Sequence, residues 1–118
     1  MKKIIVMLVL MSMTGASFAH AAGRSSWAVP TQVDIERGNG FMVYGMFGNP
    51  GECTSSNKFY VKKEHPQYDK IYSAILAAFT SGKKIRTYIH DCETVLWYSN
   101  ASVTYNILMP NGDVQIKN

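Results

Sequence analysis

The stretch 90–93 holds the chemically most capable group of residues in this sequence. Asp91 and Glu93 lie two positions apart around Cys92, and His90 precedes them. Such carboxylates could act as general acid and base on a glycosidic bond, or could hold a cation. No GxSxG or HExxH pattern and no phosphate-binding glycine-rich loop accompanies them, and His65 lies in another segment. We therefore predict a protein that is not an enzyme, with no catalytic residue, no metal site and no cofactor.

The two cysteines, Cys53 and Cys92, are 39 positions apart, and neither belongs to a CxxC pattern. In an exported chain, two cysteines most simply form a disulfide. Closing a loop of this length is worth about 4 kcal/mol in the chain-entropy description, a large share of a small domain's stability. We therefore predict a Cys53–Cys92 disulfide, in preference to a reactive thiol or a pair of metal ligands.

The first 21 residues have the pattern of a secretory signal peptide. Met1-Lys2-Lys3 is a positive start, Ile4–Met13 is apolar apart from one serine, and Ala19-His20-Ala21 offers a small-residue cleavage site. The apolar run of about ten residues is shorter than the roughly 20 that a bilayer-spanning helix needs. We predict cleavage near Ala21 and a single secreted or periplasmic domain over 22–118, without membrane insertion. A retained membrane anchor is the alternative.

The charge balance argues against a nucleic-acid ligand. The formal net charge is +4, and removal of the two N-terminal lysines would lower it to +2. Nucleic-acid binders show a stronger basic patch. Lysines do interleave with an aromatic residue in Lys58, Tyr60 and Lys62, but single-strand binding through that pattern is at odds with export. We interpret these lysines as residues that protect strand edges from pairing with other chains.

Aromatic residues are more numerous than a core of this size requires. The chain holds two tryptophans, seven tyrosines and five phenylalanines. Exposed rings flanked by polar groups suit sugars, whose C–H faces stack on rings while their hydroxyls form hydrogen bonds. We predict a glycan site at the loop that contains Trp97, Tyr98 and Asn100, together with Tyr88. The alternative is that Trp97 closes one end of the fold next to Cys92.

Hydrophobic periodicity predicts the elements that must position these residues. Alternation of apolar and polar residues favours strands, and Tyr68, Ile71 and Ile75 recur at helical spacing before Gly82. The expected order is strands at 31–37, 41–47 and 58–63, a helix at 67–81, and strands at 83–90, 102–109 and 114–117. Because a barrel leaves few open edges, we expect a mainly β domain with one helix, a small five-stranded barrel like the OB-fold. An open α+β antiparallel sheet with one helix across it is the alternative.

One segment of the chain resembles a known protein family. Residues 68–88, YDKIYSAILAAFTSGKKIRTY, resemble the helix-to-strand segment in the binding subunits of subtilase cytotoxin and typhoid toxin. The shared features are an aromatic residue that opens the helix, an Ile-Tyr pair and alanines along it, Ser-Gly at its end and an Ile-Arg-x-Tyr strand. The resemblance implies an exported OB-fold subunit that assembles as a homopentamer, binds sialylated or related glycans and docks an enzymatic A subunit.

The sequence departs from that family at its glycan site. The family has a tyrosine directly after the position of Tyr88, where this chain has Ile89, and its sugar-binding serines are echoed only by Ser25 and Ser26. The family also pairs cysteines before the helix, whereas the two cysteines here straddle it. The predicted function is a non-enzymatic, carbohydrate-binding, homo-oligomeric subunit. The alternative is a standalone periplasmic or secreted interaction protein, such as an enzyme inhibitor that acts through the loop 92–100.

Overall fold

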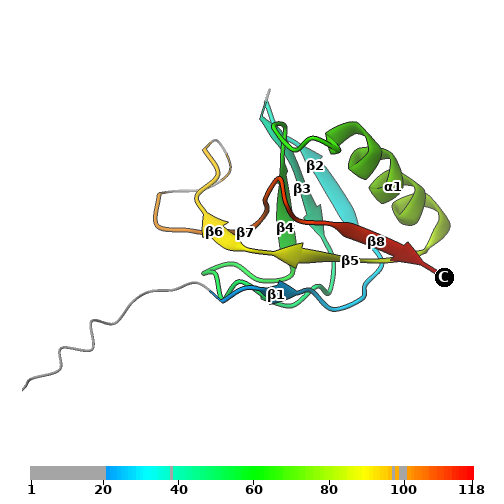
Figure 1. The fold of residues 1–118 in the computed structure, drawn as a ribbon, viewed down its shortest axis with the longest axis horizontal. Helices are drawn as coiled ribbons and strands as arrows, with labels where there is room; N and C mark the ends of the chain where they lie inside the picture. The colour runs from blue at the N-terminus through cyan, green and yellow to red at the C-terminus, as the bar shows by residue number, and fades with distance from the viewer. Residues whose placement is uncertain (1–20, 38, 97, 99–100) are drawn as a thin grey trace, which may run out of the picture.

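A computed structural model describes residues 21–37, 39–96, 98 and 101–118. The predicted signal peptide therefore lies outside the described residues, apart from Ala21. Figure 1 shows the fold, in which the elements follow in the order β1 (Gly23–Arg24), β2 (Gln32–Ile35), β3 (Gly40–Tyr44), β4 (Lys58–Lys62), α1 (Tyr68–Ser81), β5 (Lys84–Ile89), β6 (Asp91–Glu93), β7 (Tyr105–Leu108) and β8 (Val114–Lys117). The prediction of a mainly β chain with one helix is confirmed.

The strands form two sheets, and the segment 84–93 contributes a strand to each of them. One sheet has the order β2-β3-β4-β7-β6 and the other has the order β1-β5-β8. The β4–β7 pair is parallel, while the other neighbouring strands run antiparallel. Strand β5 passes through His90 directly into β6, so the chain leaves the smaller sheet and enters the larger one at that residue (Figure 1).

The prediction of a closed five-stranded barrel is wrong. The described strands form two open sheets of three and five strands, which fits the open alternative, with two sheets in place of one. The N-terminal segment pairs with β5 at Gly23 and Arg24, the Ser25 N–H donates to the Thr87 carbonyl at 2.8 Å, and a single bridge joins Ala28 to Ile85. Pro30 follows that bridge and has no N–H to donate, so the ladder cannot continue into β2.

The helix α1 buries a narrower face than its sequence predicts. Ile71, Ile75 and Ala78 are buried, whereas Phe79, which the helical spacing places on the apolar stripe, is 43% exposed. Gly82 ends the helix in the left-handed conformation, with φ of 72°, and its N–H donates to the Ala78 carbonyl. The sharp end of the helix returns the chain to β5 within two residues.

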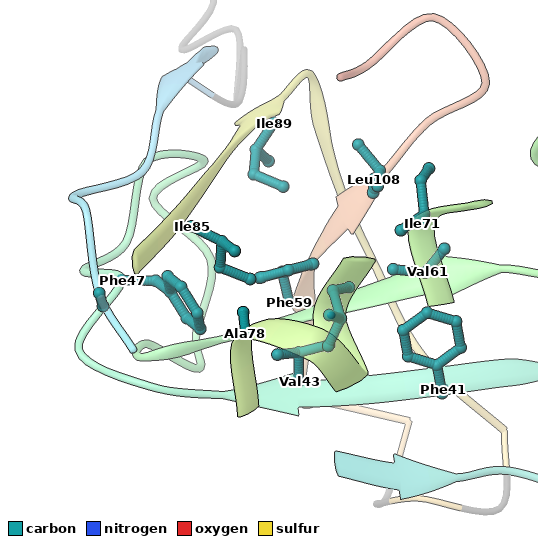
Figure 2. Packing of buried hydrophobic residues seen from close by; sticks show 12 residues of the cluster. Phe41, Val43, Phe47, Phe59, Val61, Ile71, Ala78, Ile85, Ile89 and Leu108 are labelled. Carbon is teal, nitrogen blue, oxygen red and sulfur yellow. The ribbon is translucent and has the colours of Figure 1, made fainter. Parts of the chain in front are cut away.

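Strands β3 and β4 are buried on both faces. Figure 2 shows Phe41, Val43, Phe59 and Val61 on the face that packs against the helix and β5. The alternate residues, Met42 and Tyr60, belong to a second cluster with Val95, Tyr105 and Ile107. The period of two in β4 was predicted from the sequence, and the opposite placement of its Phe59 and Tyr60 confirms it.

The predicted disulfide between Cys53 and Cys92 is confirmed, with an S–S distance of 1.98 Å. It links the loop before β4 to β6.

The fully buried Asn106 lies beside the disulfide. Its side chain accepts a hydrogen bond from the Gly51 N–H at 2.8 Å and donates one to Asn49 Oδ1 at 3.0 Å. The disulfide is compatible with a secreted or periplasmic protein. In the described part of the chain, no helix is long and apolar enough to cross a membrane.

Candidate functional site

The outward side of the smaller sheet gathers aromatic and cationic side chains. Paired residues of antiparallel strands project to the same side, and three pairs lie there: Arg24 with Tyr88, Arg86 with Gln115, and Lys84 with Lys117. The intervening residues of β5, Ile85, Thr87 and Ile89, are fully buried on the opposite side. We call this surface the outer face; it comprises Arg24, Trp27, Lys84, Arg86, Tyr88, Gln115 and Lys117.

Trp27 forms the aromatic centre of one half of the outer face. The Arg86 guanidinium carbon lies 4.6 Å from the centroid of the indole ring, and Lys117 Nζ lies 4.3 Å from it. Arg86 Nε also donates to Gln115 Oε1 at 2.6 Å. Two cations therefore hold the half-buried tryptophan, and Arg86 is oriented by an uncharged amide rather than by a carboxylate.

An ion pair orders the other half. Arg24 makes two hydrogen bonds to the Asp113 carboxylate, at 2.9 and 3.1 Å. These bonds lower the pKa of Asp113 and raise the pKa of Arg24, so both groups stay charged at neutral pH. The Arg24 guanidinium carbon lies 5.6 Å from the centroid of the Tyr88 ring, and the His90 ring packs on Tyr88 at 4.7 Å.

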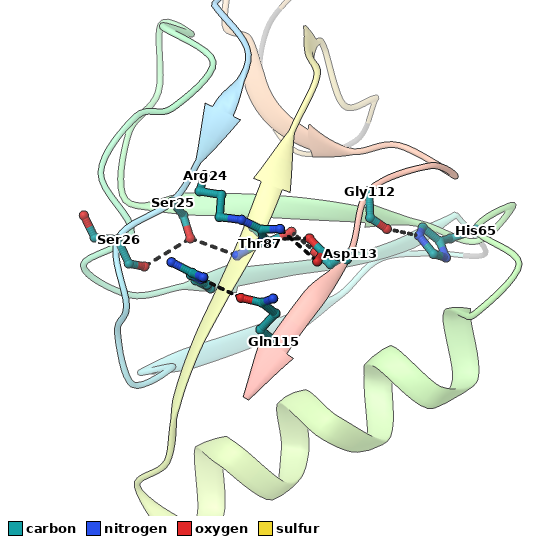
Figure 3. A network of polar contacts seen from close by, with 9 residues as sticks. Arg24, Ser25, Ser26, His65, Thr87, Gly112, Asp113 and Gln115 are labelled. Atoms are coloured by element: carbon teal, nitrogen blue, oxygen red, sulfur yellow. Dashed lines mark hydrogen bonds and ion pairs between the residues drawn. The ribbon is translucent and has the colours of Figure 1, made fainter. Parts of the chain in front are cut away.

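Buried polar residues fix the position of β1 and β8 against β5 (Figure 3). Ser25 Oγ accepts a hydrogen bond from the Thr87 N–H at 3.0 Å and donates one to the Ser26 carbonyl at 3.1 Å. Thr87 Oγ1 donates to the Asp113 carbonyl at 2.9 Å. Ser25 is 6% exposed, and its hydroxyl already donates one hydrogen bond and accepts another. It therefore positions the outer face and does not offer its hydroxyl to a ligand.

A buried histidine anchors the turn that carries Asp113. His65 Nδ1 accepts a hydrogen bond from the Gln67 N–H at 3.0 Å, so Nε2 carries the proton and donates to the Gly112 carbonyl at 2.9 Å. Figure 3 shows this contact reaching the turn before β8 from the segment that precedes the helix. The two carboxylate oxygens of Asp113 thereby face Arg24 from a fixed turn.

The structure separates the residues of the predicted glycan site. Tyr88 lies half-buried on the outer face, whereas Trp97 and Asn100 lie outside the described residues. Tyr98 lies in a turn after β6 and packs against the larger sheet, where its hydroxyl donates to Asp34 Oδ2 at 2.8 Å and its ring packs edge-on against Tyr105 with centroids 5.4 Å apart. Tyr88 and Tyr98 thus contact different sheets and different neighbours.

The remaining candidate residues have structural partners. Ile89 is fully buried, so its position cannot supply the ligand contact that a tyrosine makes there in the toxin family. Glu93 lies on β6 and pairs with Lys62, with Nζ 2.7 Å from Oε2. The Asp91 carboxylate accepts a hydrogen bond from the Cys92 N–H at 2.8 Å. Among the described residues, no group of three histidine, cysteine or acidic side chains could hold a metal ion.

Sequence reasoning missed most of the outer face. Alternation along β5 was sufficient to place Arg86 and Tyr88 on one side. Trp27 and Arg24 precede the first predicted strand at 31–37, because a strand of two residues such as β1 has no readable period. Their position depends on the register with β5, which no local pattern specifies.

Comparison of this chain with protein-family models, with curated proteins and with solved structures found no match. What the chain can bind is therefore inferred from the contacts of its own residues.

Proposed function

We propose that this protein is a non-enzymatic carbohydrate-binding protein that holds an acidic glycan on its outer face. The observation that carries the proposal is the juxtaposition of Trp27 and Tyr88 with Arg24 and Arg86 on one side of a rigid sheet. An aromatic ring can stack on the C–H face of a sugar, while a guanidinium binds a carboxylate through two parallel hydrogen bonds.

The charge of the outer face favours an acidic sugar. Arg24, Lys84, Arg86 and Lys117 supply four positive charges, and Asp113 at its margin balances only one of them. Arg86 is the best placed to bind a sugar carboxylate, because its known hydrogen-bond partner is the uncharged Gln115. A sialylated glycan, which carries one carboxylate per terminal residue, has the matching chemistry.

A glycan array with the cleaved, oxidised protein tests the proposal, followed by titration with sialyllactose and with neutral lactose. We expect binding of the sialylated sugar and a loss of about tenfold or more in affinity for Arg86→Ala. Lys70→Ala removes an equal charge from an exposed position on the helix and is the matched control. Equal binding of both sugars, or equal effects of both substitutions, contradicts the proposal.

We also propose that the protein is exported through its predicted signal peptide and works as a homo-oligomer. Strands β2 and β8 each end their sheet, and each carries an exposed isoleucine: Ile35 is 67% exposed and Ile116 is 45% exposed. An edge strand with an apolar residue can pair with the edge of another copy, and a head-to-tail contact of this kind forms a ring when the rotation between copies closes. Such a ring could dock an enzymatic partner, as the resemblance of residues 68–88 implies.

The mass of the cleaved protein in solution, measured by light scattering, tests the assembly. A mass of about five protomers supports a toxin-like ring. A monomer that binds no glycan contradicts both the ring and the glycan proposal. It would favour the alternative of a standalone interaction protein, such as an enzyme inhibitor.

A further inference from the structure

A cavity of about 210 Å³ opens on the larger sheet, on the side away from the helix. Its walls come from four places in the chain: β4 and the residues after it, the segment after β6, strand β7, and the turn before β3. The lining residues are Tyr60, Lys62, Glu64, Thr94, Val95, Leu96, Ile107 and Asn39. The outer face lies on the other sheet. The cavity is thus separate from the site proposed for the acidic glycan.

Tyr60 is the unusual member of this cavity. The residue is 4% exposed, and in the described part of the chain its hydroxyl has no hydrogen-bond partner. A buried polar group without a partner is costly, and the cost is recovered when a partner binds. The hydroxyl oxygen is shielded from solvent by the atoms around it. The covering atoms must shift slightly for a ligand to reach it.

The charge in the cavity does not suit an anion. Lys62, the cation in its wall, is already paired with Glu93, at 3.0 Å from Oε1 and 2.7 Å from Oε2. Glu64 adds a carboxylate to the wall. The cavity therefore repels a second carboxylate and offers acceptors to hydroxyl groups.

The remaining wall combines polar and apolar groups. Asn39 and Thr94 can each donate and accept a hydrogen bond, while Val95, Leu96 and Ile107 provide apolar surface. A ligand with hydroxyls at its rim and C–H groups on its face matches this mixture. The volume lies below the roughly 300 Å³ at which pockets for larger organic ligands begin, so it fits a single ring.

From these observations we infer that the cavity binds one uncharged hexopyranose residue, with a sugar hydroxyl bonded to the hydroxyl of Tyr60. The site does not rest on the proposed function, because it shares no residue with the outer face and takes a sugar without charge. A glycan receptor with both sites would hold an acidic residue on one sheet and a neutral residue on the other.

Saturation-transfer NMR with the methyl glycosides of glucose, galactose and mannose tests the inference on the cleaved, oxidised protein. We expect at least one of them to bind in the millimolar range, while free N-acetylneuraminic acid does not compete for this site. Tyr60→Phe should lower the affinity about three- to tenfold, since it removes one hydrogen bond from the complex. Tyr72→Phe, on the helix and remote from the cavity, should leave the affinity unchanged.

Thr94→Val is a second variant, because it removes another hydroxyl from the wall at nearly constant volume. No binding of any of the three glycosides overturns the inference. So does binding that Tyr60→Phe and Thr94→Val leave unchanged. Arg86→Ala separates the two sites: it should weaken binding of sialyllactose about tenfold or more and leave the neutral glycoside unaffected, so either proposal can fail alone.

Discussion

Replacing Tyr60 by phenylalanine should reduce the amount by which the free energy of unfolding falls at alkaline pH. Burial, and then the Glu36 and Glu64 carboxylates, raise the pKa of Tyr60 to about 12 from the ordinary 10.0. Between these values the unfolded chain has lost the phenolic proton and the folded chain still holds it, so rising pH favours unfolding. Ionisation of this phenol therefore leaves the stability unchanged below pH 10, and the stability falls as the pH rises from 10 through the folded pKa.

The size of the effect follows from the two pKa values. One pKa unit corresponds to about 1.4 kcal/mol, so at pH 11 the free energy of unfolding should have fallen by about 1.4 kcal/mol through Tyr60 alone. At pH 8 that loss is absent. Tyr60→Phe should instead gain up to about 1 kcal/mol at pH 8, because the hydroxyl it removes is buried without a partner.

Urea denaturation at pH 8 and pH 11, followed by tryptophan fluorescence, measures both effects. The fall in unfolding free energy between the two pH values should be about 1.4 kcal/mol smaller in Tyr60→Phe than in the natural sequence. Tyr44→Phe is the matched comparison: burial and a hydrogen bond to Asp34 raise the pKa of Tyr44 to about 12 as well. It should show the same reduced pH dependence but lose stability at pH 8. Parallel pH profiles for Tyr60→Phe and the natural sequence would refute the reasoning.

Three further substitutions test the scaffold by urea denaturation. The double change Cys53→Ala and Cys92→Ala should cost about 4 kcal/mol through the freed loop, and a loss below about 1 kcal/mol would contradict this. Asn106→Leu should cost about 2 kcal/mol or more, because the buried Gly51 N–H loses its acceptor, and an unchanged midpoint would show that another group replaces it. Asp113→Asn should cost less than about 1 kcal/mol at pH 7, since its ion pair is partly exposed. Because the pKa of Asp113 is lowered in the fold, this difference should disappear on acidification below that pKa, and a difference that persists would contradict the assignment.

Much of the secondary structure could be predicted because its signals are local. The helix was expected over 67–81 and spans Tyr68–Ser81, since helical spacing and a terminal glycine are both readable in one segment. The strands with several alternating residues were also expected. The two- and three-residue strands β1 and β6 were missed, because their pairing comes from a partner strand and not from a period of their own.

The candidate site was much less predictable than the elements. Tyr88 was chosen for its exposed ring, and it does lie on the outer face. Tyr98 was chosen for the same reason, but its hydroxyl is bonded to Asp34, a contact across 64 positions of sequence. A composition argument can state that some rings are exposed, but it cannot say which ones.

The sequence by itself determined the helix, the longer strands and the disulfide. Each depends on information within one segment or, for the disulfide, on there being only two cysteines to pair. Only the tertiary structure decided that the sheets stay open, that Trp27 stacks beneath Arg86, and that the Tyr60 hydroxyl is buried without a partner. The physical reason is that strand register and side-chain burial depend on contacts between segments that are distant in sequence. The periodicity of a single segment does not specify those contacts.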